Sequence, residues 1–371
     1  MKYEAKSPLA ADIGDYLKVF ACTAVMLQII LVEALQTHPS PSAQIGIGIF
    51  YDLTKFTAPA FIAGILYTTT RIAVDSNLTY RTYLIQMWHA LFIPTIAWTT
   101  IYLLVMPWVQ QVHRYHDLQT FAWQFINGNA APHLWYNSMM LQFIILMPVF
   151  WWLARWCGQN RFRGILVLIT VSLIQIAWLG FYDRQVFHGP HMQDWYLLDR
   201  LFISFLMYGV LGVLAWQYRH ITTRFLHKWH WVSLIIAGAS FVWINWELLS
   251  YSLPIQAINA PYYKPSMTIY DLSIICLIAA FAANQLNNRP QIAQTIHFMA
   301  NYAYPAFLSN VFWNQLLWLT FSRALTTNEP LIGIILVYLG TWVLSFASAI
   351  MIHWVWKQIR TVTFVRSKND Q

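Results

Sequence analysis

The sequence predicts an all-α fold, a polytopic integral membrane bundle of about ten transmembrane helices. Hydrophobic residues make up 58% of the chain and charged residues 10%, whereas a soluble domain carries about 25% charged residues. Twenty Trp and twenty Tyr agree with this prediction, because amphipathic rings gather at both surfaces of a bilayer. We therefore expect the lipid bilayer as a partner, and no nucleic acid, in spite of the net charge of +8.

Ten segments are apolar over the roughly 20 residues that a transmembrane helix needs. In chain order they are expected at about 13–36, 44–70, 80–107, 132–154, 163–182, 198–218, 230–250, 267–286, 293–321 and 330–356. The first apolar run is longer than the core of a signal peptide, so we expect it to remain as the first span. The sixth and ninth spans are the weakest, since one starts at Asp199 and Arg200 and the other is rich in Asn and Ser. Residues 1–371 are expected to form a single membrane domain.

The Lys and Arg residues test this order of spans. With the N-terminus on the inside, sixteen of the 22 fall in inner segments, five fall in outer segments and Lys55 lies within a span. Such a bias sets the orientation of membrane proteins. We expect both termini in the cytoplasm and a multi-pass protein of the cell membrane.

The first span carries charged groups at both ends. Asp15 and Lys18 are three residues apart near its inner end, hence on one helix face; Lys18 either pairs with Asp15 or attracts an anionic group from the cytoplasm. Glu33 lies near the outer end, as Glu247 and Asp271 do in later spans. These three carboxylates are either exposed at the membrane surface or flank a vestibule that opens outward.

Ionisable groups at membrane depth are expensive and are functional candidates by default. Asp52 and Lys55, on one face of the second span, form either an internal ion pair or the lining of a polar cavity. His89 lies near the middle of the third span, and His133 opens the fourth. A lone histidine is more often structural than catalytic, although histidine is the usual proton acceptor near neutral pH.

The ninth span, "HFMANYAYPAFLSNVFWNQLL", is too rich in amides for a helix face that contacts lipid. Its polar side chains serve either hydrogen bonding between helices or a substrate groove, and they are Asn301, Ser309, Asn310, Asn314 and Gln315. The chain has no nucleotide-binding loop, HExxH helix or Ser-His-Asp order. Its three cysteines are far apart and beside apolar segments, so we expect no metal site and no disulfide framework.

Four segments together resemble the membrane acyltransferase-3 family. "DYLKVFACTAVMLQII" is similar to the family's opening helix, and "YLIQMWHALFIPTIAWTTIYLL" to its third helix. "HLWYNSMMLQFIILMPVF" is similar to a His-Leu-Trp-Phe segment, and "ANYAYPAFLSNVFWNQLL" to a late Tyr-Ser-Phe helix. The order, the spacing and the ten-span topology agree over most of the chain.

The resemblance implies a reaction. Family members take an acyl group, often acetyl from acetyl-CoA on the cytoplasmic side, and pass it to a hydroxyl of a cell-envelope glycan or lipid-linked sugar. A first-helix histidine serves as base or relay, and basic residues near the inner face hold the phosphates of the donor. The resemblance therefore implies acyl-CoA as donor substrate and an envelope glycan as acceptor.

Matched position by position, the chain keeps only part of the family's pattern. Asp15 and Lys18 match the opening motif, but Ile29 occupies the place of the first-helix histidine, eleven residues after Lys18. The late-helix histidine falls on Asn310, whereas His133 matches its motif. Ile cannot exchange a proton, so either another residue replaces the base or the protein no longer catalyses.

We expect His133 and Glu33 to handle protons. Donor binding is expected at Lys18, Arg71, Arg81 and His89, and substrate binding at Asp52, Lys55 and Asn310. The first alternative is an inactive relative that acts as binding partner or scaffold for another envelope enzyme. It replaces the transferase if side chains plug the inner slot and leave no room for a pantetheine arm. The second alternative is a transporter or flippase, although no inverted repeat is visible.

Overall fold

The computed structural model describes residues 10–76, 78–112, 114–192 and 194–369, and these residues form helices and connecting loops with no strand. The predicted cytoplasmic N-terminus falls on residues 1–9, outside the described ranges. The α-helices are α1 (Ile13–Gln36), α2 (Pro41–Leu53), α3 (Thr57–Ser76), α4 (Tyr80–Met87), α5 (Ile93–Val105), α6 (Leu118–Asn127), α7 (Trp135–Gly158), α8 (Arg161–Tyr182), α9 (Leu206–Gln217), α10 (Arg219–Ser250), α11 (Pro265–Asn288), α12 (Pro290–Leu317), α13 (Arg323–Asn328) and α14 (Pro330–Asn369). Short 3₁₀ and π segments join several of them, including η1 (Trp88–Phe92), η2 (Pro107–Val109), η4 (Tyr196–Arg200), η6 (Ala257–Asn259) and η7 (Trp318–Ser322). The all-α fold class is confirmed.

Among the described residues, eight helical segments are long and apolar enough to cross a membrane. They are Ile13–Gln36, Pro41–Ser76, Tyr80–Val105, Trp135–Gly158, Arg161–Phe187, Arg219–Ser250, Pro265–Asn288 and Pro330–Gln358. The two weakest predicted spans are also helical, but Phe202–Gln217 is short and α12 is too polar to qualify. The prediction of about ten spans therefore agrees approximately with the helices that form.

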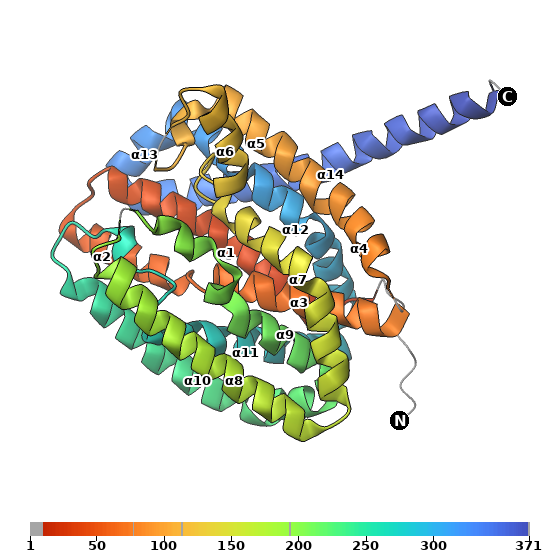
Figure 1. The fold of residues 1–371 in the computed structure, drawn as a ribbon. Coiled ribbons are helices and arrows are strands. Elements are labelled where there is room, and N and C mark those ends of the chain that lie inside the picture. Colours follow the sequence, from red (N-terminus) through yellow and green to blue (C-terminus); the bar gives the residue numbers. More distant parts are fainter. Residues whose placement is uncertain (1–9, 77, 113, 193, 370–371) are drawn as a thin grey trace.

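α1 lies in the middle of the bundle and packs against α3, α11, α12 and α14. Figure 1 shows α8 and α10 along one side of the bundle, and α14 extending away from it at its C-terminal end. We call the end at which α1 begins the inner end and the opposite one the outer end. This position lets α1 border a cavity at each end of the bundle.

A capping arrangement fixes the start of α1 to α3. Asp12 accepts a hydrogen bond from the backbone N–H of Asp15, and Asp15 accepts one from that of Asp12, which satisfies backbone donors that the first turn leaves free. Arg71 Nε lies 2.8 Å from Asp12, and Thr68 donates to the same carboxylate at 3.0 Å. A Cβ on Gly14 would lie 2.4 Å from the carbonyl oxygen of Gly64, so only glycine permits this approach of the two helices.

The second predicted span is broken. The chain leaves α2 at Leu53, turns, and starts α3 at Thr57, so Lys55 lies in the turn and not on a helix face. Tyr270 donates its hydroxyl hydrogen to the carbonyl of Leu53 at 2.8 Å, which satisfies one carbonyl that the end of α2 leaves free. The break delivers Lys55 to the interior of the bundle.

Candidate functional site

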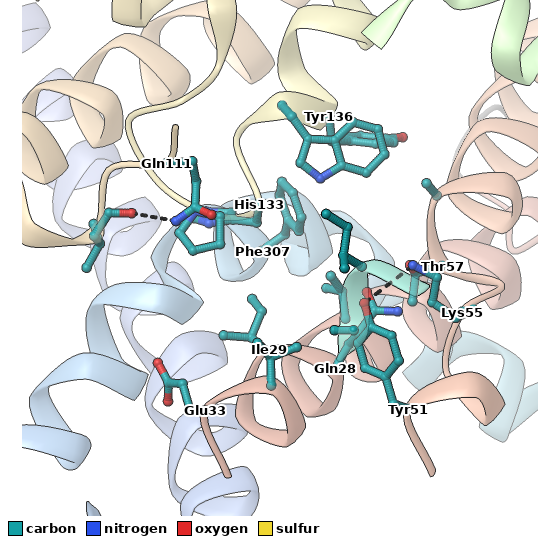
Figure 2. A pocket seen from close by; sticks show the side chains of 18 of the residues that line it. Gln28, Ile29, Glu33, Tyr51, Lys55, Thr57, Gln111, His133, Tyr136 and Phe307 are labelled. Atoms are coloured by element: carbon teal, nitrogen blue, oxygen red, sulfur yellow. Dashed lines mark hydrogen bonds between the residues drawn. The ribbon is translucent and has the colours of Figure 1, made fainter. Parts of the chain in front are cut away.

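A cavity of about 770 Å³ lies at the outer end of the bundle, and we call it the outer cavity. One face of α1 borders it, because its lining residues recur at helical spacing. These are Val25, Gln28, Ile29, Val32, Glu33 and Gln36. The opposite walls come from the turn between α2 and α3, the start of α7, α12 and the loop after η6. Figure 2 shows Ile29 between Gln28 and Glu33, with His133 and Phe307 across the space.

Glu33 is held by two amides of α12. Asn314 donates to Glu33 Oε2 at 2.8 Å, and Gln315 donates to Oε1 at 2.5 Å. Trp108 in turn donates its indole N–H to the side-chain oxygen of Gln315 at 3.1 Å. Hydrogen bonds to charged groups are stronger than those between neutral groups. The carboxylate of Glu33 is thus fixed in position beside the cavity.

His133 is buried in the turn before α7, and its tautomer follows from its contacts. Nε2 lies 3.3 Å from the carbonyl oxygen of Leu308, and a carbonyl only accepts, so Nε2 carries the proton. In the neutral ring Nδ1 then has a lone pair, and no protein group bonds to it. The ring also packs edge-to-face against Phe307 at 4.9 Å and Tyr102 at 5.5 Å between ring centroids. Burial lowers the pKa of His133 to about 3, so the ring is neutral; it borders the outer cavity, with Nδ1 itself buried.

Ile29, at the position that the resemblance assigns to a histidine, also lines the outer cavity and is only partly buried. Glu33 follows it by four residues on the same face of α1. Gln28 beside it lies 3.5 Å from the hydroxyl of Tyr262, whose oxygen is 2.7 Å from that of Thr57. The outer cavity therefore adjoins Ile29, the position that the resemblance assigns to a histidine.

Lys55 is enclosed by aromatic rings and does not form the ion pair predicted as one alternative. Its ammonium lies 3.9 Å from the ring centre of Tyr262 and 5.1 Å from that of Tyr51, and it donates to the Tyr51 hydroxyl at 3.4 Å. Asp52 is fully buried, and neither of its carboxylate oxygens has a hydrogen-bond partner. Because the helix ends at Leu53, the three-residue spacing no longer places the two groups on one face. Lys55 lines the outer cavity, and Asp52 does not.

Asp199 adds a second carboxylate to the outer cavity, from η4 ahead of the apolar segment Phe202–Gln217. Burial raises the pKa of Asp199 to about 6, although the Arg200 guanidinium 3.2 Å away opposes the shift. The hydroxyl of Tyr263 donates to the Asp199 carbonyl at 2.7 Å. These contacts hold the segment against the mouth of the cavity.

Of the other two carboxylates predicted near the outer surface, neither lines the outer cavity. Asp271 is fully buried, and the Tyr208 hydroxyl donates to it at 3.3 Å. Glu247 pairs with Lys264 at 2.7 Å. The predicted vestibule therefore includes only Glu33 of the three.

A second cavity, of about 750 Å³, lies at the inner end, and we call it the inner cavity. Its charged lining comprises Asp12, Arg71, Asp75, Arg219, Arg224 and Lys228, with His220 and His227. Four cations against two carboxylates leave an excess of positive charge. A positive concave surface attracts phosphate groups.

The remaining predicted donor residues lie elsewhere. Lys18 pairs with Asp15 at 2.8 Å, and His297 donates to the same carboxylate at 2.7 Å. Arg81 and His89 are exposed on α4 and η1 and line neither cavity. Of the four, only Arg71 borders the inner cavity.

Asn310, predicted to bind substrate, is buried and donates to the backbone carbonyl of Phe307 at 2.7 Å. It does not line the outer cavity, whereas Phe307 and Gln315 on the same helix do. The amide-rich helix α12 thus contributes Asn314 and Gln315, which both hold Glu33, and Gln315 also lines the outer cavity.

Side chains fill the space between the two cavities. Tyr16, Cys22, Ile62 and Leu66 have no exposed surface, and we call them the packed layer. On α3, Phe61 borders the outer cavity and Tyr67 the inner one, a separation of about 9 Å at 1.5 Å per residue. The inner cavity does open near the N-terminal segment, as expected, but the packed layer closes it from the outer cavity.

Sequence reasoning missed the aromatic walls of the outer cavity. They are Tyr51, Phe61, Trp108, Trp135, Tyr136, Tyr262, Phe307 and Trp318. In a chain in which 17% of residues are aromatic, such residues give no distinguishing signal. The basic residues at the start of α10 line the inner cavity. In the sequence they contributed only to the excess of Lys and Arg in the predicted inner segments.

The comparison with family models matches residues 15–352 to the acyltransferase-3 family, whose model is described as an acyltransferase domain. The match covers most of the chain, so the chain belongs to this family. With its apolar helices, it is a multi-pass, acyltransferase-like membrane protein. Comparisons with curated proteins and with solved structures gave no match.

Proposed function

We propose that this protein transfers an acyl group, such as acetyl, from a cytoplasmic acyl-CoA to a hydroxyl of a cell-envelope glycan or lipid-linked sugar in the cell membrane. One observation carries the proposal. The outer cavity holds Glu33 and His133 beside Ile29, the position of the family's histidine. A carboxylate from α1 and a histidine from the turn before α7 therefore line one space.

The aromatic walls and amides of the outer cavity suit a sugar acceptor. The hydrophobic faces of sugar rings stack on aromatic side chains, and amide groups hydrogen-bond to hydroxyls. Gln28, Gln36, Gln111 and Gln315 supply the amides. The lining thus offers both kinds of contact that a glycan needs.

In the proposed reaction the acceptor oxygen attacks the thioester carbonyl carbon. His133 Nδ1 takes the hydroxyl proton as the new C–O bond forms, and the C–S bond breaks. The thiolate of CoA leaves and takes this proton from the His133 imidazolium, which returns the ring to its neutral form. Glu33, which lines the same cavity, stabilises the positive charge that develops on the His133 ring.

The donor's phosphates are proposed to bind the cations of the inner cavity, with Arg71 among them. The pantetheine arm then has to pass the packed layer, which requires that α1 and α3 separate locally. A structure with acyl-CoA bound tests directly whether the two helices separate.

Two observations favour a second candidate, an inactive relative that serves as a scaffold for another envelope enzyme. Ile29 stands where the family's base is expected, and the packed layer divides the two cavities. In that case the outer cavity binds a glycan or a partner without chemistry.

The deciding experiment incubates the purified protein in nanodiscs with acyl-labelled acetyl-CoA and an envelope glycan extract. Transfer of label to glycan, or release of free acetate, supports the enzyme. Retention of all label on CoA across acetyl, butyryl and octanoyl donors, while the protein still binds glycan, supports the scaffold.

A further inference from the structure

An apolar groove of about 510 Å³ opens on the side of the bundle next to the inner cavity. Helices α8, α9, α10 and α11 border it, and residues of α1 and α3 form its floor. Ile13 and Tyr67 line both spaces. The groove and the inner cavity therefore adjoin.

On α3 and α11 the residues that line the groove are followed along the helix by residues that line the cavity, whereas on α10 the two sets alternate between residues 219 and 228 and lie on different faces. On α3, Ala63 and Tyr67 border the groove, and Tyr67, Arg71 and Asp75 border the cavity. These four residues are spaced by four, hence on one face of the helix. On α11 the groove residues 272–279 are followed by cavity residues 283–287. The cavity thus continues the groove toward the inner end along α3 and α11, and lies beside it along α10.

The two spaces together have the length of one membrane leaflet. From Ala63 to Asp75 the helix rises about 18 Å at 1.5 Å per residue. A bilayer with its headgroups is about 40–45 Å thick, so one leaflet is roughly 20 Å. A phospholipid of the inner leaflet therefore fits the length of the groove and cavity together.

Charge is arranged along this length as a phospholipid requires. The groove walls are almost wholly apolar, with Arg161 at the start of α8 as their charged member. The inner cavity presents Arg219, Arg224 and Lys228 from the first turns of α10. Basic pockets between transmembrane helices on the cytoplasmic side suit anionic headgroups.

We propose that this composite site binds an anionic phospholipid of the inner leaflet, with its acyl chains in the groove and its phosphate headgroup on the cations of α10. The lipid enters sideways from the bilayer, whereas a soluble donor enters the inner cavity from the cytoplasm. Where the proposed transferase function also holds, lipid and acyl-CoA compete for the same cations. Lipid binding itself does not depend on catalysis.

Native mass spectrometry of the purified full chain, titrated with phosphatidylglycerol or phosphatidylcholine and with no donor or acceptor present, tests the site. We expect phosphatidylglycerol to bind more tightly. The double variant Arg224→Ala/Lys228→Ala should lower its affinity by about 25-fold, since each surface cation contributes roughly fivefold. The matched control Arg155→Ala/Arg289→Ala removes two exposed inner cations that line neither cavity nor groove and should change affinity by less than threefold.

A second pair of variants tests the groove. Leu168→Trp fills it from α8, and should weaken phosphatidylglycerol binding at least tenfold. Ile176→Trp places the same ring on an exposed position of α8 outside the groove, and should leave binding unchanged. Equal binding of the two lipids, equal effects of the two double variants, or full binding to Leu168→Trp would overturn the proposal. Tight binding of palmitoyl-CoA at this site, together with no binding of phosphatidylglycerol, would also overturn the proposal.

Discussion

Replacing His133 by Gln tests the proposed proton acceptor with little change of volume. Gln keeps an amide donor for the Leu308 carbonyl, now bonded to Nε2 at 3.3 Å. It has no lone pair of comparable basicity. A positioned general base contributes about 10² to 10⁴-fold in rate, so transfer should fall by about that factor.

The stability change follows from the ring contacts that Gln loses. His133 packs edge-to-face on Phe307 and Tyr102, and each aromatic pair contributes about 0.5–1.5 kcal/mol. The free energy of unfolding should therefore fall by about 1–3 kcal/mol. Thermal unfolding in detergent measures that loss, and single-turnover transfer of labelled acetyl measures the rate.

The matched control is His89→Gln, the same exchange at an exposed histidine outside both cavities. It should retain the parent rate. A His133→Gln protein that transfers acetyl within twofold of the parent rate would refute the role of His133. An equal loss in both variants would mean that the exchange acts through stability alone.

Three further changes have defined outcomes. Ile29→His places a base on the face of α1 beside Glu33. Acetyl transfer at limiting donor should rise by at least tenfold, and an unchanged rate would contradict the proposal that a missing base at this position slows the reaction. Lys55→Met removes a buried cation from the ring of Tyr262 and should lower the unfolding free energy by about 2 kcal/mol. Lys55→Arg keeps a cation and should retain most of this free energy. Equal melting temperatures of the two variants would contradict the contact between cation and ring. For Asp199 the folded pKa of about 6 exceeds its ordinary value of 3.8, so its contribution to stability is complete below pH 3.8 and is lost as pH rises through 6. Asp199→Asn should therefore match the parent's melting temperature at pH 4 and exceed it at pH 8. A difference in melting temperature that does not change with pH would disprove the pKa shift.

The positions of the helices along the chain could be predicted from the lengths of the apolar segments alone. Both bundle interior and lipid are apolar, so the sequence of a span indicates its depth but only weakly its rotation. Glu33 and His133 were predicted at the outer end and do border one cavity. Arg81 and His89 lie at plausible depth, yet their helix turns them to the outside of the bundle.

The break between α2 and α3 shows a second limit. Residues 44–70 contain Thr54 and Thr57 but no glycine or proline at the turn itself, so the local sequence gives no strong stop signal. Tertiary contacts, such as the Tyr270 bond to Leu53, determine where α2 ends. Contacts between segments more than 200 residues apart are not readable from local pattern.

The packed layer also determines where the membrane voltage acts. Two cavities that enter from opposite ends leave about 9 Å of dense side chains between Phe61 and Tyr67, so the electrical potential difference falls mainly across this short distance. A unit charge that crosses 100 mV changes in energy by about 2.3 kcal/mol. The layer therefore insulates one side of the membrane from the other, and any charged ligand that parts it does work with or against the potential across that membrane.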